Sequence, residues 1–346
     1  MGHHRNSAVA AAALAALVFS GCASDSSSDP VIRLGDSYSP AHPFGKYGTA
    51  TFNEAAQESG FQVDYFPAGQ MGNPQDLATL VGAGVLTIAP ASAAYLEDQF
   101  PLSSVSDLPN MTTDACVAAN AMMDLLSEGG ILYEEEYEPM GMRPLWISII
   151  PNYEILTASR QVTTPEDLPG LIIRSSGGAF DVTMAATGAA AVSMPAGDTY
   201  EAMSRNTVDG TVMPFLSTVP YRLDEVSAYS TDGLNLGSVG IPYVMSHEAW
   251  DALTAEQQSA VQAAADEANQ TLCEALNTLH EEGRTFLQDN GVTMTEVDLS
   301  PGSAWGQLTE PVPQRWAQSL DDIGLPGSEV LSQYESAIAE HEGTQR

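Results

Sequence analysis

The sequence predicts an α/β protein built as two lobes, and three observations support this. Strand-like and helix-like segments alternate from Val31 onward, which is the pattern of a parallel sheet covered by helices. The same alternation begins again near residue 143, so a second sheet is expected. The chain has 346 residues, and single hydrophobic cores stop growing at about 250–300 residues. We therefore expect two lobes with a cleft between them.

The elements of each lobe follow from residue type and periodicity. In the first lobe, strand composition covers residues 31–36, 61–66 and 85–90, and helical periodicity covers 42–60 and 74–82. In the second run, strands are expected at 143–150, 171–176, 190–194 and 207–213, with helices at 179–187 and 198–205. A further strand-like segment, 237–245, precedes the last helical part of the chain.

One helix is predicted to be long enough to cross both lobes. Thr254 and Gln257 have the spacing of a capping box, and the helical pattern that they open continues to Glu282 without proline or glycine. Extended to Asn290, this helix would reach roughly 50 Å at 1.5 Å per residue. The division that follows is residues 31–151 and 240–280 in lobe I and 152–239 and 281–346 in lobe II, with closure about the crossings near Pro151 and Gly240.

The first residues have the character of an export signal. Arg5 precedes an apolar run at 8–19, and Ser20-Gly21-Cys22 is a small-residue site that ends on cysteine. Residues 1–21 are therefore predicted to be a lipoprotein signal peptide, Cys22 the lipidated residue, and 22–30 a flexible tether. Phe19 stands where such sites usually carry leucine, so an ordinary signal peptide cleaved nearby stays an alternative. In both cases the protein is exported, to the periplasm or the outer face of the cytoplasmic membrane.

The charge of the chain excludes one class of partner. Eleven basic residues stand against 45 acidic ones, a net charge of −34, and removal of residues 1–21 would make it −35 because only Arg5 is lost. Binding to nucleic acid requires clustered cations, so nucleic acid is not expected as a partner. The acids are spread along the chain, which suits a surface that stays hydrated in salty water.

The cysteines beyond Cys22 are Cys116 and Cys273, both in helical segments. Export permits a disulfide, but the sequence gives no reason for the two to meet, and buried free thiols are the expected state.

No motif for enzyme chemistry is present. The sequence lacks G-x-S-x-G, a P-loop, G-x-G-x-x-G after a strand and H-E-x-x-H. Outside the signal segment the histidines are widely spaced, so neither a metal site nor a cofactor is expected.

Arg174 is the most informative residue. It ends the segment PEDLPGLIIR, residues 165–174, in which a capped turn leads into an apolar strand. Ligands of open α/β sheets bind outside the carboxyl ends of the strands, and a guanidinium offers two parallel N–H groups to a carboxylate. Arg174 is therefore expected to anchor an anion, and an ion pair with one of the 45 acids is the alternative.

At this point the chain resembles a family, the extracytoplasmic solute-binding proteins of tripartite ATP-independent periplasmic (TRAP) transporters, of the DctP type. The resemblance covers nearly the whole mature sequence. It rests on SPAHP at 39–43, FPAGQMG at 66–72, QFPL at 99–102, TPEDLPGLIIR at 164–174, the Gly188 to Pro195 segment, and YEAM at 200–203 leading to VDG at 208–210. It implies a periplasmic-binding-protein-like fold of the cluster C type, an interlobe cleft, and Arg174 paired with the carboxylate of a small organic acid.

Two departures from the family pattern narrow the expected ligand. Asn152-Tyr153-Glu154 stands where many members carry a second arginine, and Met213 where many carry asparagine. Losing a cation and an amide disfavours a dicarboxylate or a sialic acid and favours a monocarboxylate with an apolar or aromatic body. The expected pocket walls are Trp146, Tyr153, Met194, Met213 and Phe215, with polar groups from Tyr38, Gln70 and Tyr95; ordinary core packing is the alternative for each wall residue.

The expected function is a non-enzymatic receptor that captures the acid and delivers it to a membrane permease, driven by an ion gradient as the resemblance implies. The alternatives are a binding protein of an ATP-driven importer, a sensor subunit, a receptor for a dicarboxylate and, most remotely, an exported lipoprotein enzyme.

Overall fold

Two β-sheets organise the part of the chain that the computed structural model describes, residues 30–150, 152–177 and 179–344. The first sheet has the order β2-β1-β3-β10-β4. β1 is parallel to β2 and β3, whereas β10 is antiparallel to β3 and β4. Its strands are β1 (Val31–Gly35), β2 (Gln62–Phe66), β3 (Ile88–Pro90), β4 (Met142–Ile150) and β10 (Val239–Ser246), and its helices are α1 (Ala50–Glu58), α2 (Pro74–Gly82), α3 (Ala115–Leu126) and α6 (His247–Asp251).

The second sheet forms the second lobe, with the order β11-β9-β5-β8-β6-β7. β6 lies parallel to both β7 and β8, and β5 is antiparallel to β8 and β9. Its strands are β5 (Tyr153–Thr157), β6 (Ile172–Ser175), β7 (Ala190–Ser193), β8 (Gly210–Pro214), β9 (Tyr229–Asp232) and β11 (Thr293–Glu296), and its helices are α4 (Ala179–Thr187), α5 (Thr199–Ser204) and α8 (Ala304–Thr309).

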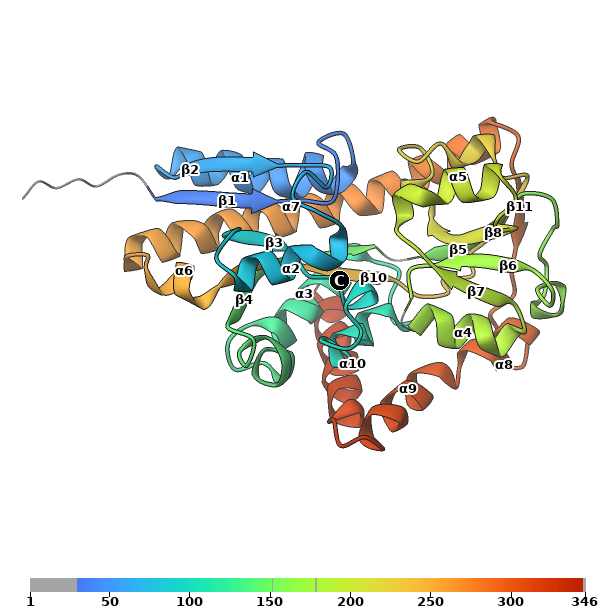
Figure 1. The fold of residues 1–346 in the computed structure, drawn as a ribbon. Coiled ribbons are helices and arrows are strands. Elements are labelled where there is room, and N and C mark those ends of the chain that lie inside the picture. The colour runs from blue at the N-terminus through green and yellow to red at the C-terminus, as the bar shows by residue number, and fades with distance from the viewer. Residues whose placement is uncertain (1–29, 151, 178, 345–346) are drawn as a thin grey trace, which may run out of the picture.

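The chain passes between the sheets from β4 to β5 and back from β9 to β10. The lobes are also joined by α7 (Ala255–Asp289), which runs along both of them (Figure 1). α7 packs on α1, α3 and β4 of the first lobe and on the turn Phe215–Ser217 of the second. The predicted two-lobed α/β fold with a long crossing helix is confirmed.

Local sequence explains where these helices begin. The Thr254 side chain accepts from Gln257 N while the Gln257 side chain accepts from Thr254 N, so the predicted capping box opens α7. Asp114 caps α3 by accepting from Cys116 N and Val117 N. Pro74 occupies the first position of α2, where its missing N–H has no helical partner to lose.

Cys116 and Cys273 form a disulfide, so the expectation of free thiols is wrong. The helices that carry them, α3 and α7, pack against each other and bring the two Cα atoms to 4.8 Å. The bond therefore ties the long helix to the first lobe, a contact that spacing along the chain did not indicate.

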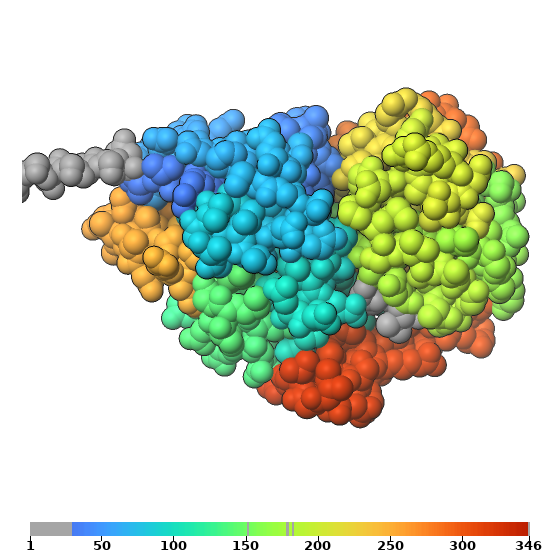
Figure 2. All heavy atoms as spheres, in the orientation of Figure 1, coloured from blue at the N-terminus to red at the C-terminus, as the bar shows by residue number. Residues whose placement is uncertain are grey.

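The C-terminal segment departs from the predicted division. α8 packs on α4 of the second lobe, but α10 (Gly327–Thr344) packs on α3 of the first lobe, with α9 (Val312–Asp321) between them. Trp316 of α9 donates to Ser104 Oγ of the first lobe at 2.8 Å. In Figure 2 the red C-terminal helices lie beneath the blue and cyan first lobe and reach toward the yellow-green second lobe. The last part of residues 281–346 thus returns to lobe I.

The N-terminal 29 residues and Pro151 lie outside the described residues, and with them the predicted signal peptide, Cys22 and most of the predicted tether. Within the described part, no helix combines the length and apolar character needed to cross a bilayer.

Candidate functional site

The candidate site is a narrow cavity between the two lobes. Its floor is made by aliphatic residues of the strands next to the crossings, Ile150, Val239 and Ile241. The volume open to the centre of a water molecule is about 20 Å³, against the roughly 10–15 Å³ that one buried water needs. A wider hollow of about 400 Å³ continues from the cavity toward the surface and shares Tyr38, His42, Tyr95 and Tyr221 with it. The lobes are thus nearly closed over the site.

Arg174 is the cationic group of the cavity. It lies near the end of β6, between β7 and β8, and its side chain is 1% exposed. Its Nε and Nη2 donate to the Met194 carbonyl at 3.0 and 2.7 Å, and its Nη1 donates to the Val212 carbonyl at 3.4 Å. These bonds use three of the five N–H groups of a guanidinium.

The charge of Arg174 is not neutralised within the described residues. The ion pairs there involve other arginines and one histidine, so the salt-bridge alternative for Arg174 is not realised. Carbonyl oxygens fix the orientation of the guanidinium, yet they supply no compensating carboxylate. Because an unpaired buried charge is costly, the site is prepared for an anion that completes its coordination.

Ser176 lies two residues after Arg174 and also lines the cavity. Its side chain is 4% exposed, and its hydroxyl has no hydrogen-bond partner among the described atoms. Leaving a buried hydroxyl without a hydrogen-bond partner normally costs about 1–3 kcal/mol of folding free energy. Ser176 is therefore a second donor available to an anion at this strand end. The rule that ligands bind at the carboxyl ends of strands would have found it.

Four tyrosines surround these groups: Tyr38 and Tyr95 from the first lobe, and Tyr153 and Tyr221 from the second. No hydrogen bond to any of their hydroxyls occurs within the described residues, so all four are available to a ligand. Burial raises the pKa of Tyr38, Tyr153 and Tyr221, although the charge of Arg174 acts in the opposite direction on Tyr153 and Tyr221. Tyr38, Tyr153 and Tyr221 therefore present neutral hydroxyls, and all four rings present apolar faces.

Asp36 holds the first-lobe wall in place. It follows β1, is fully buried, and accepts from Tyr38 N at 3.0 Å and Thr49 Oγ1 at 2.7 Å. The Tyr243 hydroxyl donates to the same carboxyl group at 3.3 Å. Burial raises the pKa of Asp36 to about 6, and the hydrogen bonds oppose this shift. Asp36 thus orients the backbone from which Tyr38 enters the cavity.

The structure brings together some of the residues proposed from the sequence and places others elsewhere. Arg174, Tyr38, Tyr95, Tyr153 and Met213 line the cavity. Trp146 lies in the first-lobe core, stacked on Phe52 and Tyr243, and Phe215 lies in the second-lobe core against His280. The Met194 carbonyl accepts from Arg174, and Gln70 is exposed and is not part of the cavity lining.

Three residues that line the cavity were not predicted from the sequence: His42, Ser176 and Tyr221. His42 belongs to the SPAHP segment, while the loop that carries Tyr221 has no periodic signal.

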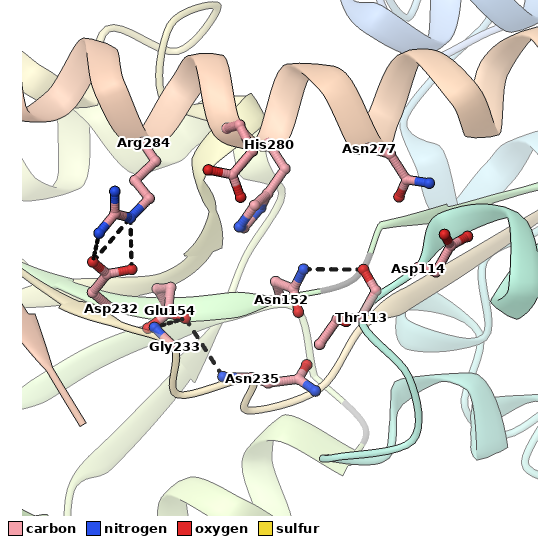
Figure 3. A pocket seen from close by; sticks show the side chains of 11 residues that line it. Thr113, Asp114, Asn152, Glu154, Asp232, Gly233, Asn235, Asn277, His280 and Arg284 are labelled. Carbon is pink, nitrogen blue, oxygen red and sulfur yellow. Dashed lines mark hydrogen bonds and ion pairs between the residues drawn. The ribbon is translucent and has the colours of Figure 1, made fainter. Parts of the chain in front are cut away.

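A second pocket of about 450 Å³ is lined by residues of α7 and residues next to both crossings (Figure 3). Tyr153 and Glu154 of β5 point to opposite faces of the strand: Tyr153 lines the ligand cavity, whereas Glu154 lines this pocket. Asn152, which precedes β5, also lines this pocket. Asn152 has a φ of 64° and donates from Nδ2 to the Thr113 carbonyl at 3.3 Å. Asn152, next to the predicted crossing, therefore has a left-handed backbone and is held to the first lobe.

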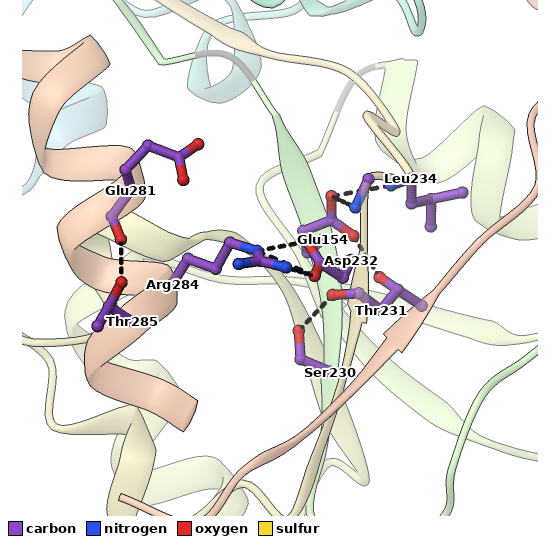
Figure 4. A network of polar contacts seen from close by, with 9 residues as sticks. Glu154, Ser230, Thr231, Asp232, Leu234, Glu281, Arg284 and Thr285 are labelled. Carbon is purple, nitrogen blue, oxygen red and sulfur yellow. Dashed lines mark hydrogen bonds and ion pairs between the residues drawn. The ribbon is translucent and has the colours of Figure 1, made fainter. Parts of the chain in front are cut away.

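Glu154 organises the second-lobe side of this pocket (Figure 4). Its Oε1 accepts from Gly233 N and Leu234 N at 3.0 and 2.9 Å, and its Oε2 accepts from Thr231 Oγ1 at 2.6 Å. Burial raises its pKa to about 8, against the effect of these hydrogen bonds. Beside it, Arg284 of α7 forms an ion pair with Asp232 at the end of β9. Glu154 therefore shapes the return crossing and does not face the ligand cavity.

Comparison with protein families gives one match that covers most of the chain. The model described as bacterial extracellular solute-binding protein, family 7 (DctP) matches residues 34–319. The C4-dicarboxylate-binding periplasmic protein DctP of Rhodobacter capsulatus is 25% identical over 318 residues, 90% of this chain and 91% of that protein. The ectoine-binding periplasmic protein TeaA of Halomonas elongata is 24% identical over 284 residues, 80% of each chain.

Solved structures share the fold at lower identity. A TRAP solute-binding protein from Rhodoferax ferrireducens in complex with benzoate has a TM-score of 0.82 and 19% identity, covering 91% of this chain and 99% of that one. One from Bordetella bronchiseptica with bound mandelate has a TM-score of 0.78 and 22% identity, covering 90% and 99%. One from Sulfitobacter with bound β-D-galacturonate has a TM-score of 0.76 and 19% identity, covering 88% and 99%.

Proposed function

We propose that this chain, which belongs to the family 7 bacterial extracellular solute-binding proteins and is thus the solute receptor of a TRAP transporter, captures a small monocarboxylate with an apolar or aromatic body. Members of this family work outside the cytoplasm, bind small organic acids and deliver them to membrane permease subunits. They are receptors and not enzymes.

The observation that carries the proposal is the state of Arg174. Its guanidinium is buried, is oriented by the Met194 and Val212 carbonyls, and has no acidic partner among the described residues. Two N–H groups are left for the ligand carboxylate, and Ser176 Oγ lies in the same cavity lining. The carboxylate therefore completes the coordination of Arg174 in the closed cleft.

The number of charges favours one carboxylate over two. Arg174 is the only arginine or lysine among the described residues that line the cavity, so a second carboxylate of the ligand would be buried without a cation. The aromatic rings and Met213 surround a narrow space, which suits a flat or slender apolar body better than a polyhydroxylated one. The relatives that bind benzoate and mandelate are consistent with this class.

A dicarboxylate is the second candidate, because the relative from Rhodobacter capsulatus binds C4-dicarboxylates. In that case the four tyrosine hydroxyls would have to hold the second carboxylate. Anchoring of the receptor to the membrane through a lipid on Cys22 is part of the proposal, and mass spectrometry of the protein extracted from membranes tests it.

The experiment is a thermal-shift series with the purified protein in high salt against benzoate, phenylacetate, cyclohexanecarboxylate, succinate, malate and a sialic acid. A ligand at a hundred times its dissociation constant adds about 2.7 kcal/mol to the free energy of unfolding. We expect the monocarboxylates to raise Tm and the Arg174→Gln variant to lose that rise. Arg205→Gln, a change in an exposed arginine of the same lobe, is the matched control and should keep it.

Stabilisation by succinate or malate instead would replace the monocarboxylate assignment with the dicarboxylate one. Stabilisation that survives in Arg174→Gln would remove Arg174 as the anchor.

A further inference from the structure

His42 is a buried polar residue of the ligand cavity whose hydrogen-bonding capacity is only half used. It lines both the cavity and its mouth, and its side chain is 3% exposed. The ring is fixed on several sides, because it stacks on Tyr38 with centroids 4.7 Å apart and meets the edge of Phe44 at 4.6 Å. Across the cleft, the Tyr221 ring of the second lobe lies 5.6 Å away.

One hydrogen bond determines which nitrogen of His42 carries the proton. Phe44 N donates to His42 Nδ1 at 3.3 Å, so Nδ1 is the acceptor and the neutral ring carries its hydrogen on Nε2. His42 Nε2 has no hydrogen-bond partner among the described atoms, although it is buried. A buried N–H group without a partner is costly, and His42 is one of the residues that line the ligand cavity.

We infer that His42 is a specificity residue of the receptor, and that its Nε2–H binds an oxygen acceptor on the body of the ligand, such as a hydroxyl, ether or carbonyl oxygen. This inference rests on the proposed function and narrows it to oxygen-substituted monocarboxylates. The carboxylate is held on the second lobe by Arg174, and the oxygen is held on the first lobe by His42. A ligand that makes both contacts joins the two lobes, which is what stabilises the closed form.

His42 supplies a donor without supplying charge. Burial lowers the pKa of this histidine to about 3, so the ring is neutral near pH 7. A neutral donor distinguishes a ligand with an acceptor from one without it, because the unsubstituted ligand leaves the buried N–H unpaired. It does not compensate a second carboxylate, in agreement with the single cation of the cavity.

The test measures a ratio of affinities in place of a single affinity. Isothermal titration calorimetry gives dissociation constants for benzoate against 3-hydroxybenzoate and 4-hydroxybenzoate, and for cyclohexanecarboxylate against 3-oxocyclohexanecarboxylate. In the wild-type protein, we expect at least one oxygen-substituted acid to bind about fivefold or more tightly than its parent. In His42→Phe this preference should fall to within about twofold, while His42→Gln, which keeps an N–H donor, should retain part of it.

Using a ratio separates specificity from a general loss of folding, because damage to the fold weakens both members of a pair alike. His247→Phe, which alters a histidine of α6 that contacts Tyr133 outside the cavity, is the matched control and should leave every ratio unchanged.

Four results would overturn the inference. A preference that persists in His42→Phe means that another group binds the oxygen. An equal loss for parent and substituted acids in that variant, with the fold intact by circular dichroism, means that His42 binds the carboxylate. Binding of the parent acids without any preference in the wild-type protein overturns the inference about His42 and leaves the proposed function standing. If no carboxylate of the series binds, the proposed function itself fails and the inference fails with it.

Discussion

Two adjacent residues of β5 have different roles: one lines the ligand cavity, and the other holds the segment that returns to the first lobe. Tyr153 enters the ligand cavity, whereas Glu154, the next residue, is buried on the opposite face and accepts from Gly233 N, Leu234 N and Thr231 Oγ1. Adjacent residues of one strand thus serve the ligand cavity and the return crossing separately.

Buried acids of this kind make the stability of the protein dependent on pH. Burial raises the pKa of Asp107 and Glu136 to about 7 and that of Glu154 to about 8. A raised pKa means that the folded state holds a proton which the unfolded state has released, so this contribution is complete below about pH 4 and is lost as the pH rises through the folded values. His42, whose pKa is lowered, acts in the opposite direction, but only below about pH 6.5.

We therefore expect the free energy of unfolding to fall between about pH 6.5 and 8.5, measured by denaturant unfolding in high salt. Glu154→Gln keeps an oxygen for the backbone N–H groups and an N–H donor for Thr231, so it imitates the protonated acid. This variant should reduce the slope of stability against pH. Glu281→Gln, a change in an exposed acid lining the same pocket, is the control; a slope equally steep in wild type and Glu154→Gln would contradict the assignment.

Among single residues, the sequence allowed prediction of those site residues whose chemistry is unusual for their position. Arg174 could be singled out because a cation is rare in this chain and follows an apolar strand. Trp146 and Phe215 could not be distinguished from pocket walls, because a core aromatic and a ligand-contacting aromatic have the same composition and the same strand or turn context. His42 was visible as a histidine but its unpaired Nε2 depends on a bond from Phe44 N that only the folded backbone makes.

Among the elements, the long helix α7 makes contacts with both lobes. Its middle is bonded to α3 through Cys116 and Cys273. Toward its C-terminal end, Gly283 lies so close to the turn at Phe215 that an added Cβ would come within 2.3 Å of the Phe215 carbonyl. The next residue, Arg284, forms an ion pair with Asp232 of the second lobe. The helix is thus fixed to lobe I at its middle and to lobe II toward its C-terminal end.

The disulfide should stabilise the folded protein strongly. It closes a loop between residues 157 apart, and a loop of this length corresponds to a stabilisation of about 5 kcal/mol in the chain-entropy model. We expect reductant to lower the denaturation midpoint of the wild-type protein and to have no effect on the Cys116→Ala/Cys273→Ala double variant. An unchanged midpoint in reduced wild type, with both thiols titrated as free, would contradict this.

Prediction of elements succeeded where the local pattern is strong. The ranges of α2 and α4 and the capping box of α7 follow from local signals that the structure reproduces. β5 was missed because the strand has only five residues and is buried on both faces, so it shows no alternation of polar and apolar side chains. Asn152, which has a positive φ, directly precedes it. The antiparallel pairing of β10 was also missed, since a strand that returns from the other lobe carries no local mark of its direction.

The whole molecule is a pair of sheets joined by two strand crossings, one long helix and a returning C-terminal segment (Figure 1). Tyr153 and Glu154, neighbours in β5, line the ligand cavity and the second pocket respectively. The position of α10 on the first lobe could not be predicted, because its amphipathic pattern indicates that it packs but not on which lobe.

The central claim is that the closed cleft holds a carboxylate on Arg174, and a crystal structure of the protein with its best-binding monocarboxylate tests it most directly. We predict a cleft closed as described here, with carboxylate oxygens within hydrogen-bonding distance of Arg174 Nη1 and Nη2 and of Ser176 Oγ. A carboxylate bound elsewhere, with the Arg174 guanidinium contacting only the Met194 and Val212 carbonyls, would contradict the account.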